Sequence, residues 1–202
     1  MKIIRYAAVA APVGGVLLGA LDFVWIKYVP YPFAELGNSM AVWAVAGFLL
    51  AFWGRWGWAR GIGAAVVLLV VAVPSYYLAA MVIQHDDAAT MYNTTALLWM
   101  GSAVIAGVVF GGAGVAARRP GRWQAVAPAM PAAVLFAEAG LLAGRIGDPD
   151  YGIDPLWSAL LDVALGVLLT ALIAGPRRWV ALLWAVPLAL VGWVLLSVAR
   201  FG

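Results

Sequence analysis

Long apolar runs, separated by short polar or charged loops, dominate the pattern of residues along the chain. Each run approaches the about 20 residues that an α-helix needs to cross a bilayer, and each ends at charges, glycine or proline. The pattern predicts an all-α polytopic membrane helix bundle in a single domain, residues 1–202, with about seven transmembrane helices. The predicted helices cover residues 6–28, 38–53, 61–83, 94–116, 124–144, 156–174 and 179–199.

The charged residues predict the orientation of these helices. Nine of the twelve basic residues precede the first run or lie in alternate loops without any acid: Lys2, Arg5, Arg55, Arg60, Arg118, Arg119, Arg122, Arg177 and Arg178. The remaining loops hold six acids: Glu35, Asp86, Asp87, Asp148, Asp150 and Asp154. Because cytoplasmic loops are enriched in Lys and Arg, we expect a multi-pass protein of the inner (plasma) membrane with its N-terminus inside and its C-terminus outside.

Composition supports the membrane interpretation and excludes several kinds of site. Of the 202 residues, 66% are hydrophobic and 10% are charged, and the mean hydropathy is +1.00. The basic residues lie in short loops and form no phosphate-binding face, so nucleic acid is not an expected partner. The chain has no cysteine and one histidine, His85, which excludes disulfides, thiolate metal sites and multi-histidine sites. No phosphate-binding or dinucleotide motif is present, and no cofactor or metal is expected.

A weak internal repeat runs through the last six predicted helices. Its three segments begin in a similar way at Asn38, Asn93 and Asp154 and carry an Arg-Trp pair in the following inner loop. The tryptophans Trp43, Trp99 and Trp157 precede Pro74, Pro131 and Pro187 by 31, 32 and 30 residues. This spacing suggests a threefold repeat of helical hairpins, but the natural length of a hairpin produces a similar spacing.

Small residues and prolines indicate close helix packing. Three glycine pairs have a spacing of four residues, which lets helix backbones approach closely: Gly15 and Gly19, Gly107 and Gly111, and Gly140 and Gly144. The helical prolines free carbonyl groups one turn earlier and are expected to kink their helices.

Three acids lie inside apolar runs, each about six residues from the outer end of its helix: Asp22, Glu138 and Asp162. At 1.5 Å per residue this depth is about 9 Å. Because a carboxylate in hydrocarbon is costly, such acids usually face a cavity or a partner. Several aromatic residues occupy the same level: Trp43, Tyr76, Tyr77, Trp99 and Trp193. An interfacial aromatic belt explains any one of them, but the set with three acids predicts a shared outward-facing pocket.

The outer loops supply further polar residues. Glu35 and Asn38 precede the second predicted helix and complete the predicted substrate-binding set with Trp43, Tyr76, Tyr77 and Trp99. The pair Asp86-Asp87 could hold magnesium on a diphosphate, but the sequence has no second acidic motif to complete such a site. We therefore interpret this pair as solvated loop charge, and His85 as a loop residue.

Three segments carry a resemblance to a known family: Phe33–Trp43, Tyr76–Tyr77 and Phe136–Leu141. They resemble a family of uncharacterised integral membrane proteins from high-GC bacteria, and this resemblance implies no activity. In architecture and residue types the chain is also similar to small seven-helix membrane-bound terpene cyclases, which use embedded acids to protonate an alkene or epoxide. Ala7 and Ala11 resemble a feature of vitamin-importer substrate-binding components, although these usually have six helices and both termini inside.

These patterns lead to three functional hypotheses. The first is a cofactor-independent cyclase acting on an apolar isoprenoid, with Glu138 as proton donor and Asp22 or Asp162 as its partner. Trp43, Tyr76, Tyr77 and Trp99 would line its chamber, because electron-rich rings attract cations. The second is a binding or transport component for a small cationic or aromatic solute, with the acids as counter-charges. The third is an accessory membrane subunit whose acids pair with polar groups of neighbouring helices.

Overall fold

The computed structural model describes residues 2–198, and the side chains of residues 2–5 and of Asn38 lie outside the described part. Every regular element within that range is helical, which confirms the all-α prediction. Contacts divide the chain into two compact units. Unit 1 comprises Met1–Tyr28 and Trp43–Arg118, and unit 2 comprises Val29–Val42 and Arg119–Gly202. The single domain predicted from the sequence stays a prediction.

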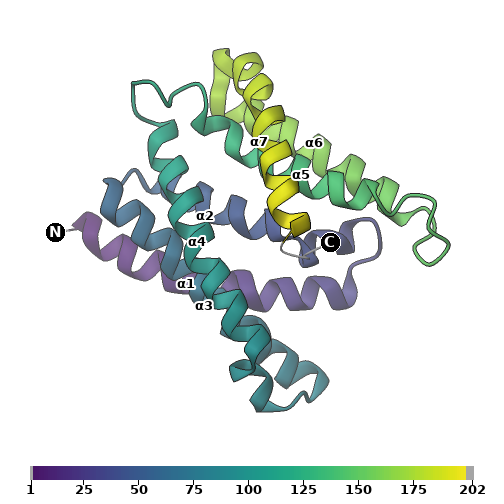
Figure 1. Ribbon diagram of the computed structural model, residues 1–202. Helices are drawn as coiled ribbons and strands as arrows, with labels where there is room; N and C mark the ends of the chain where they lie inside the picture. Colours follow the sequence, from purple (N-terminus) through teal and green to yellow (C-terminus); the bar gives the residue numbers. More distant parts are fainter. Residues whose placement is uncertain (1, 199–202) are drawn as a thin grey trace. The chain divides into compact units, whose positions relative to one another are not determined.

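The described part contains seven α-helices (Figure 1): α1 (Lys2–Tyr28), α2 (Met40–Gly54), α3 (Trp58–Gln84), α4 (Thr94–Ala117), α5 (Met130–Ala143), α6 (Asp154–Ala174) and α7 (Arg178–Val198). Short 3-10 helices lie between them: η1 (Phe33–Asn38), η2 (Ala88–Tyr92), η3 (Ala127–Ala129) and η4 (Gly175–Arg177). The helix ends follow local chemistry. The Asn93 side chain accepts a hydrogen bond of 2.8 Å from the Ala96 N–H at the start of α4, and Gly175 adopts a φ of 54° between α6 and α7.

Unit 1 is built around α3. Both α1 and α4 pack against this helix (Figure 1). The core contains Leu68, Leu69 and Val73 of α3 with Ala103 of α4. The α2 side chains from Trp43 onward also pack against this core. As the sequence predicted, two glycine pairs lie at close backbone contacts: Gly15 and Gly19 of α1 meet α3, and Gly107 and Gly111 of α4 meet α3.

Unit 2 is built around α5, which packs against both α6 and α7. Buried alanines form the contact of α5 and the preceding η3 with α7, because small side chains allow the helices to approach: Ala129, Ala132, Ala181 and Ala185. Two sequence expectations are wrong in this unit. Pro131 lies in the first turn of α5, where no helical hydrogen bond is lost, so it does not kink the helix. Gly144 meets only the carbonyl of Leu141 in its own segment, so it does not mediate helix packing.

Within residues 2–198, four helical stretches are long and apolar enough to cross a membrane: Tyr6–Tyr28, Trp58–Gln84, Thr94–Ala117 and Asp154–Val198. The last stretch contains α6 and α7, joined through η4. The described residues thus contain four candidate spans, whereas the sequence predicted about seven. Part of the difference arises because α2 and α5 have only 15 and 14 residues. Helices of those lengths span about 22 and 21 Å, less than the hydrocarbon thickness of about 30 Å.

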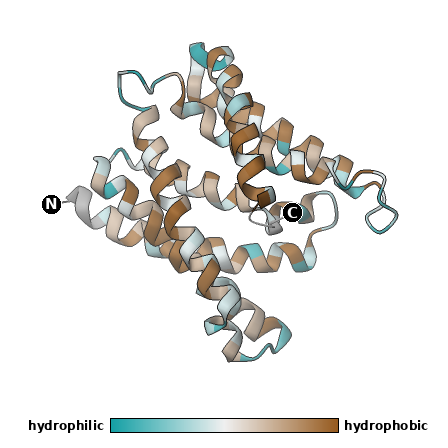
Figure 2. Cartoon of the chain, in the orientation of Figure 1, coloured by the Kyte–Doolittle hydropathy of each residue, from teal (hydrophilic) through white to brown (hydrophobic). Residues whose placement is uncertain are grey.

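The long helices leave large apolar side chains on their outer surfaces. Ile105 is 68% exposed, Leu172 is 72% exposed and Leu183 is 73% exposed. Figure 2 shows hydrophobic residues along the helices and hydrophilic residues concentrated in the loops. Water would not stabilise so much exposed apolar surface, and the chain is therefore a membrane protein.

Candidate functional site

In unit 2, the carboxylate of Glu138 caps the beginning of α2. The Ser39 hydroxyl donates to Oε2 of Glu138 at 2.6 Å, the Ala41 N–H donates to the same atom at 3.0 Å, and the Met40 N–H donates to Oε1 at 3.2 Å. Ser39 Oγ also accepts a hydrogen bond of 3.0 Å from the Val42 N–H. The first N–H groups of a helix lack intrahelical partners, and Glu138 supplies partners from a helix distant in sequence. It therefore holds the first residues of α2, Met40–Val42, against α5 within unit 2.

Asp162 is the second acid of unit 2, and its surroundings differ from those of Glu138. It is 3% exposed and makes no hydrogen bond with the described residues. Its carboxyl group lies close enough to Glu138 and Glu35 to interact electrostatically with both. The buried face of α6 that carries Asp162 also carries Ser158 and Thr170. Of the predicted acids, the structure thus brings together Glu138, Asp162 and Glu35.

An aromatic ring lies against α6 one turn along the helix from Asp162, on the contact between α5 and α6. Gly166, one turn after Asp162, lies against the ring of Phe136, and a Cβ atom at Gly166 would be 2.8 Å from Phe136 Cε1. The described part of unit 2 therefore has a buried carboxyl group and an aromatic ring on adjoining helices. Phe136 is not among the site residues predicted from the sequence.

The loop before η1 lies near the beginning of α6. Tyr31 interacts with Glu35 and Asp154, and η1 packs against α6. Partial burial raises the pKa of Tyr31, and the negative charges of Glu35 and Asp154 raise it further. Tyr31 consequently stays neutral at physiological pH and remains a hydrogen-bond donor. The side chain of Asn38, a predicted substrate-binding residue, lies outside the described residues.

Unit 1 contains the third predicted acid, Asp22, among aromatic side chains. Its carboxyl group interacts with the indole N–H of Trp43, and Tyr76 lies within electrostatic range. The ring of Tyr76 makes edge-to-face contacts with Phe23 and Tyr77, with centroid distances of 5.3 and 5.6 Å. The structure therefore brings Asp22, Trp43, Tyr76 and Tyr77 together from α1, α2 and α3. Because Asp22 belongs to a different unit from Glu138 and Asp162, the pocket shared by three acids stays a prediction.

Trp99 and the outer-loop residues have other surroundings. Trp99 packs on the core of unit 1 near Leu68 and Ala103. Asp87 accepts a hydrogen bond of 2.9 Å from the Ala89 N–H and so caps η2. Across residues 2–198, no group of three His, Cys, Asp or Glu side chains is arranged to hold a metal ion.

The chain matches one family across nearly its entire length, residues 2–200. It belongs to the family of unknown function DUF6518. No curated protein and no solved structure matches it. The expected membership of an uncharacterised family is thus confirmed, while the resemblance to terpene cyclases stays a hypothesis. For this DUF6518 chain, functional inference depends on the geometry of its own residues.

Two residues of this DUF6518 chain have structural roles that the sequence analysis missed. Ser39 caps α2 and binds Glu138, and a serine directly before an apolar run is a recognised signal for a helix start. Arg118, interpreted from sequence only as a marker of orientation, donates from Nη2 to the carbonyls of Ala51 and Trp56 at 3.2 and 3.0 Å. It therefore satisfies carbonyl groups at the end of α2 and just beyond it.

Proposed function

We propose that this chain is a membrane-embedded, acid-initiated cyclase for an apolar isoprenoid substrate, and that Asp162 donates the starting proton. The observation that supports this proposal is the contrast between two neighbouring carboxyl groups. Glu138 accepts three hydrogen bonds, whereas Asp162 is buried beside it without a hydrogen-bonding partner among the described residues. This contrast exchanges the roles that the sequence suggested, in which Glu138 was the donor.

In this proposal the two carboxyl groups have different protonation states, with Glu138 ionised and Asp162 protonated. Glu138 is surrounded by donors, an arrangement that suits an ionised carboxylate, which only accepts hydrogen bonds. Two negative charges at short range repel strongly in a medium of low dielectric constant, so the pair is expected to hold one proton. The hydroxyl of Asp162 is then free to transfer that proton.

The proposed reaction is an isomerisation. The proton passes from Asp162 to a terminal alkene carbon or an epoxide oxygen of the substrate, and the electron pair of a neighbouring alkene closes the ring by forming a C–C bond. A C–H proton of the resulting carbocation then returns to the Asp162 carboxylate, so no co-reactant is needed. Aromatic faces stabilise cations, and the α5 residue Phe136, whose ring lies against Gly166 one turn along α6 from Asp162, would supply such a face.

Product formation tests this proposal. Membranes containing the protein are incubated with a farnesylated phenol and with its terminal epoxide, and the extracts are searched for a cyclic isomer of unchanged mass. We expect Asp162→Asn, which preserves the side-chain shape, to lower the yield at least tenfold. Asp150→Asn is the matched control, because Asp150 lies exposed in the α5–α6 loop. An undiminished yield in Asp162→Asn, or no wild-type product from either probe, would contradict the cyclase.

The arrangement around Asp22 favours a second candidate, the binding or transport of a small organic cation. A carboxylate next to aromatic rings suits a quaternary ammonium group, because charge attraction and cation–π interaction act together. The expected result is saturable retention of tetramethylammonium by the same membranes, reduced in Asp22→Asn and unchanged in Asp150→Asn. Retention without cyclic product would select this candidate over the cyclase.

The membrane topology that accompanies these proposals has seven spans, in the plasma membrane, with the N-terminus inside and the C-terminus outside. The excess of basic residues in alternate loops supports this orientation. The recurring Trp-to-Pro spacing supports a threefold hairpin repeat, although Pro131 has a different place in its helix from Pro74 and Pro187.

Cysteine labelling checks this topology, because the chain has no cysteine of its own. Ala59→Cys and Ala89→Cys place single exposed thiols near opposite ends of α3, and Ser197→Cys places one near the end of α7. On intact cells, a membrane-impermeant maleimide should label Ala89→Cys and Ser197→Cys, and should label Ala59→Cys only after the membrane is opened. The reverse pattern would show the opposite orientation. Labelling of Ala89→Cys without Ser197→Cys would show an odd number of spans between these two positions, where the proposed topology has four.

A further inference from the structure

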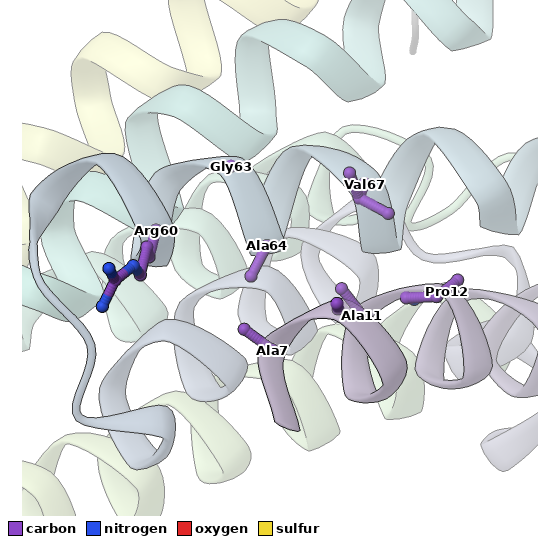
Figure 3. A pocket seen from close by; sticks show the side chains of 8 residues that line it. Ala7, Ala11, Pro12, Arg60, Gly63, Ala64 and Val67 are labelled. Carbon is purple, nitrogen blue, oxygen red and sulfur yellow. The ribbon is translucent and has the colours of Figure 1, made fainter. Parts of the chain in front are cut away.

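An open groove of about 360 Å³ runs between α1 and α3 in unit 1 (Figure 3). Its floor is made by the small side chains of Ala11 and Ala64, which are 2% and 6% exposed. Pro12 and Val67 contribute further apolar surface. The groove exists because small residues face each other on the two helices and leave space that longer side chains would fill. Its apolar lining suits a hydrocarbon chain.

One end of the groove carries a positive charge. Arg60, in the first turn of α3, is its charged lining residue, and Figure 3 shows this side chain at the end of the groove. The guanidinium makes no hydrogen bond or ion pair with the described residues. Asp86 follows the far end of α3, which is about 36 Å from Arg60 along the helix. The charge of Arg60 is therefore available to an anion from outside the chain.

We propose that this groove binds an anionic phospholipid, with one acyl chain along the α1–α3 floor and the phosphate at Arg60. Charge complementarity indicates this occupant, because an acyl chain matches the apolar floor and an anionic headgroup matches Arg60 at the end of the groove. Basic residues near a membrane surface attract anionic lipids in this way. Under the proposed topology Arg60 faces the cytoplasm, and the lipid belongs to the inner leaflet. None of the acids of the proposed reaction lines this groove.

Two variants remove the two parts of this site independently. Gly63 lines the groove, and a Cβ atom placed there has no neighbour within 4 Å. Gly63→Leu should therefore fill the groove without a clash and raise local helix propensity. Gly101 of α4 is equally open but does not line the groove, so Gly101→Leu is its matched control. Arg60→Gln removes the charge, and Arg177→Gln removes one exposed arginine elsewhere.

Native mass spectrometry measures the bound lipid directly. Each variant is purified, exposed to equal amounts of phosphatidylglycerol and phosphatidylcholine in mixed micelles, and transferred to the gas phase. The wild type should retain one phosphatidylglycerol in preference to phosphatidylcholine. Arg60→Gln should lower this preference about fivefold, and Gly63→Leu should abolish retention of either lipid. Both controls should behave as the wild type, and added inorganic phosphate should not displace the lipid.

Three outcomes would overturn the proposal. The first is equal retention of both lipids by the wild type, which would show that the charge of Arg60 does not discriminate between anionic and zwitterionic lipids. The second is unchanged phosphatidylglycerol binding in both Arg60→Gln and Gly63→Leu, which would place the lipid elsewhere. The third is a dimer that Gly63→Leu disrupts, which would show that a second copy of the chain occupies the groove.

Discussion

Replacing Glu138 with alanine is expected to destabilise unit 2 by about 3 kcal/mol, because hydrogen bonds to a charged group contribute strongly and buried donors left without partners are costly. The variant would leave the Ser39 hydroxyl and the N–H groups of Met40 and Ala41 without their acceptor. Ser39 is 4% exposed and Ala41 is fully buried, so water cannot easily replace the carboxylate. Unfolding in detergent micelles, followed by the helical circular dichroism signal, measures the loss.

Glu35→Ala is the matched control for this measurement. Glu35 lies near the same carboxyl groups, but its side chain makes no hydrogen bond with the described residues. Its removal should change the free energy of unfolding by no more than about 0.5 kcal/mol. Ser39→Ala should lie between the two, near 1 kcal/mol, because it removes a helix cap but leaves Glu138 in place. Equal stability of Glu138→Ala and Glu35→Ala would refute the capping role.

This structural role limits what a Glu138 variant reveals about catalysis. A loss of product in Glu138→Gln has two explanations, a missing partner for the proton donor and a loosened α2. Asp162→Asn lacks that ambiguity, since Asp162 makes no hydrogen bond in the described structure that the substitution would break. The donor is therefore better identified at Asp162.

The sequence predicted the helices well where an apolar run has clear chemical ends. The predicted 94–116 matches α4 because Asn93 caps its first turn, and the predicted 61–83 lies inside α3, which stops where His85 adopts a left-handed conformation. The prediction for 124–144 begins too early. Residues 122–126 form turns that lead into η3, and the N–H groups of Val126 and Ala127 both donate to the Trp123 carbonyl. Hydropathy alone cannot distinguish such apolar turns from helix.

The candidate site was predictable in its residue types but not in its groupings. Counting residues along each helix gives the depth that selected Asp22, Glu138 and Asp162 as candidate site residues. The contacts between side chains depend on how each helix is rotated and packed. In these uniformly apolar helices no periodic pattern of polar residues marks the buried face, so the rotation cannot be read from the sequence. The structure accordingly pairs Asp22 with Trp43 and groups Asp162 with Glu138, a division that equal depth did not reveal.

Glycine contacts in α1 connect packing with the Asp22 arrangement and give the largest expected effect. A Cβ atom at Gly19 would overlap the Ala72 carbonyl oxygen of α3 and lie 2.8 Å from the Tyr76 nitrogen. Both are backbone atoms, which cannot rotate away as a flexible side chain can. Gly19→Leu should therefore force α1 away from α3 and destabilise unit 1 by more than about 3 kcal/mol, measured by the same unfolding experiment.

Two other glycines provide a graded control for this prediction. A Cβ atom at Gly14 would meet only the flexible end of Leu68, at 3.1 Å, and one at Gly101 would meet nothing within 4 Å. We expect Gly14→Leu to be mildly destabilising, and Gly101→Leu to be neutral or stabilising by up to about 1 kcal/mol through helix propensity. Similar losses in all three variants would mean that helix flexibility, not backbone contact, determines the effect.

The position of Gly19 extends this prediction to ligand binding. Gly19 lies one turn before Asp22 on α1 and touches the backbone of Tyr76 on α3, so the same contact sets the separation between the acid and the aromatic rings. If the Asp22 arrangement binds organic cations, Gly19→Ala should weaken tetramethylammonium retention without altering any group that contacts the ligand. Gly14→Ala should leave retention unchanged, because its neighbour in α3 is a side chain that can move. Unaltered retention in Gly19→Ala would show that the close packing of α1 on α3 does not position Asp22.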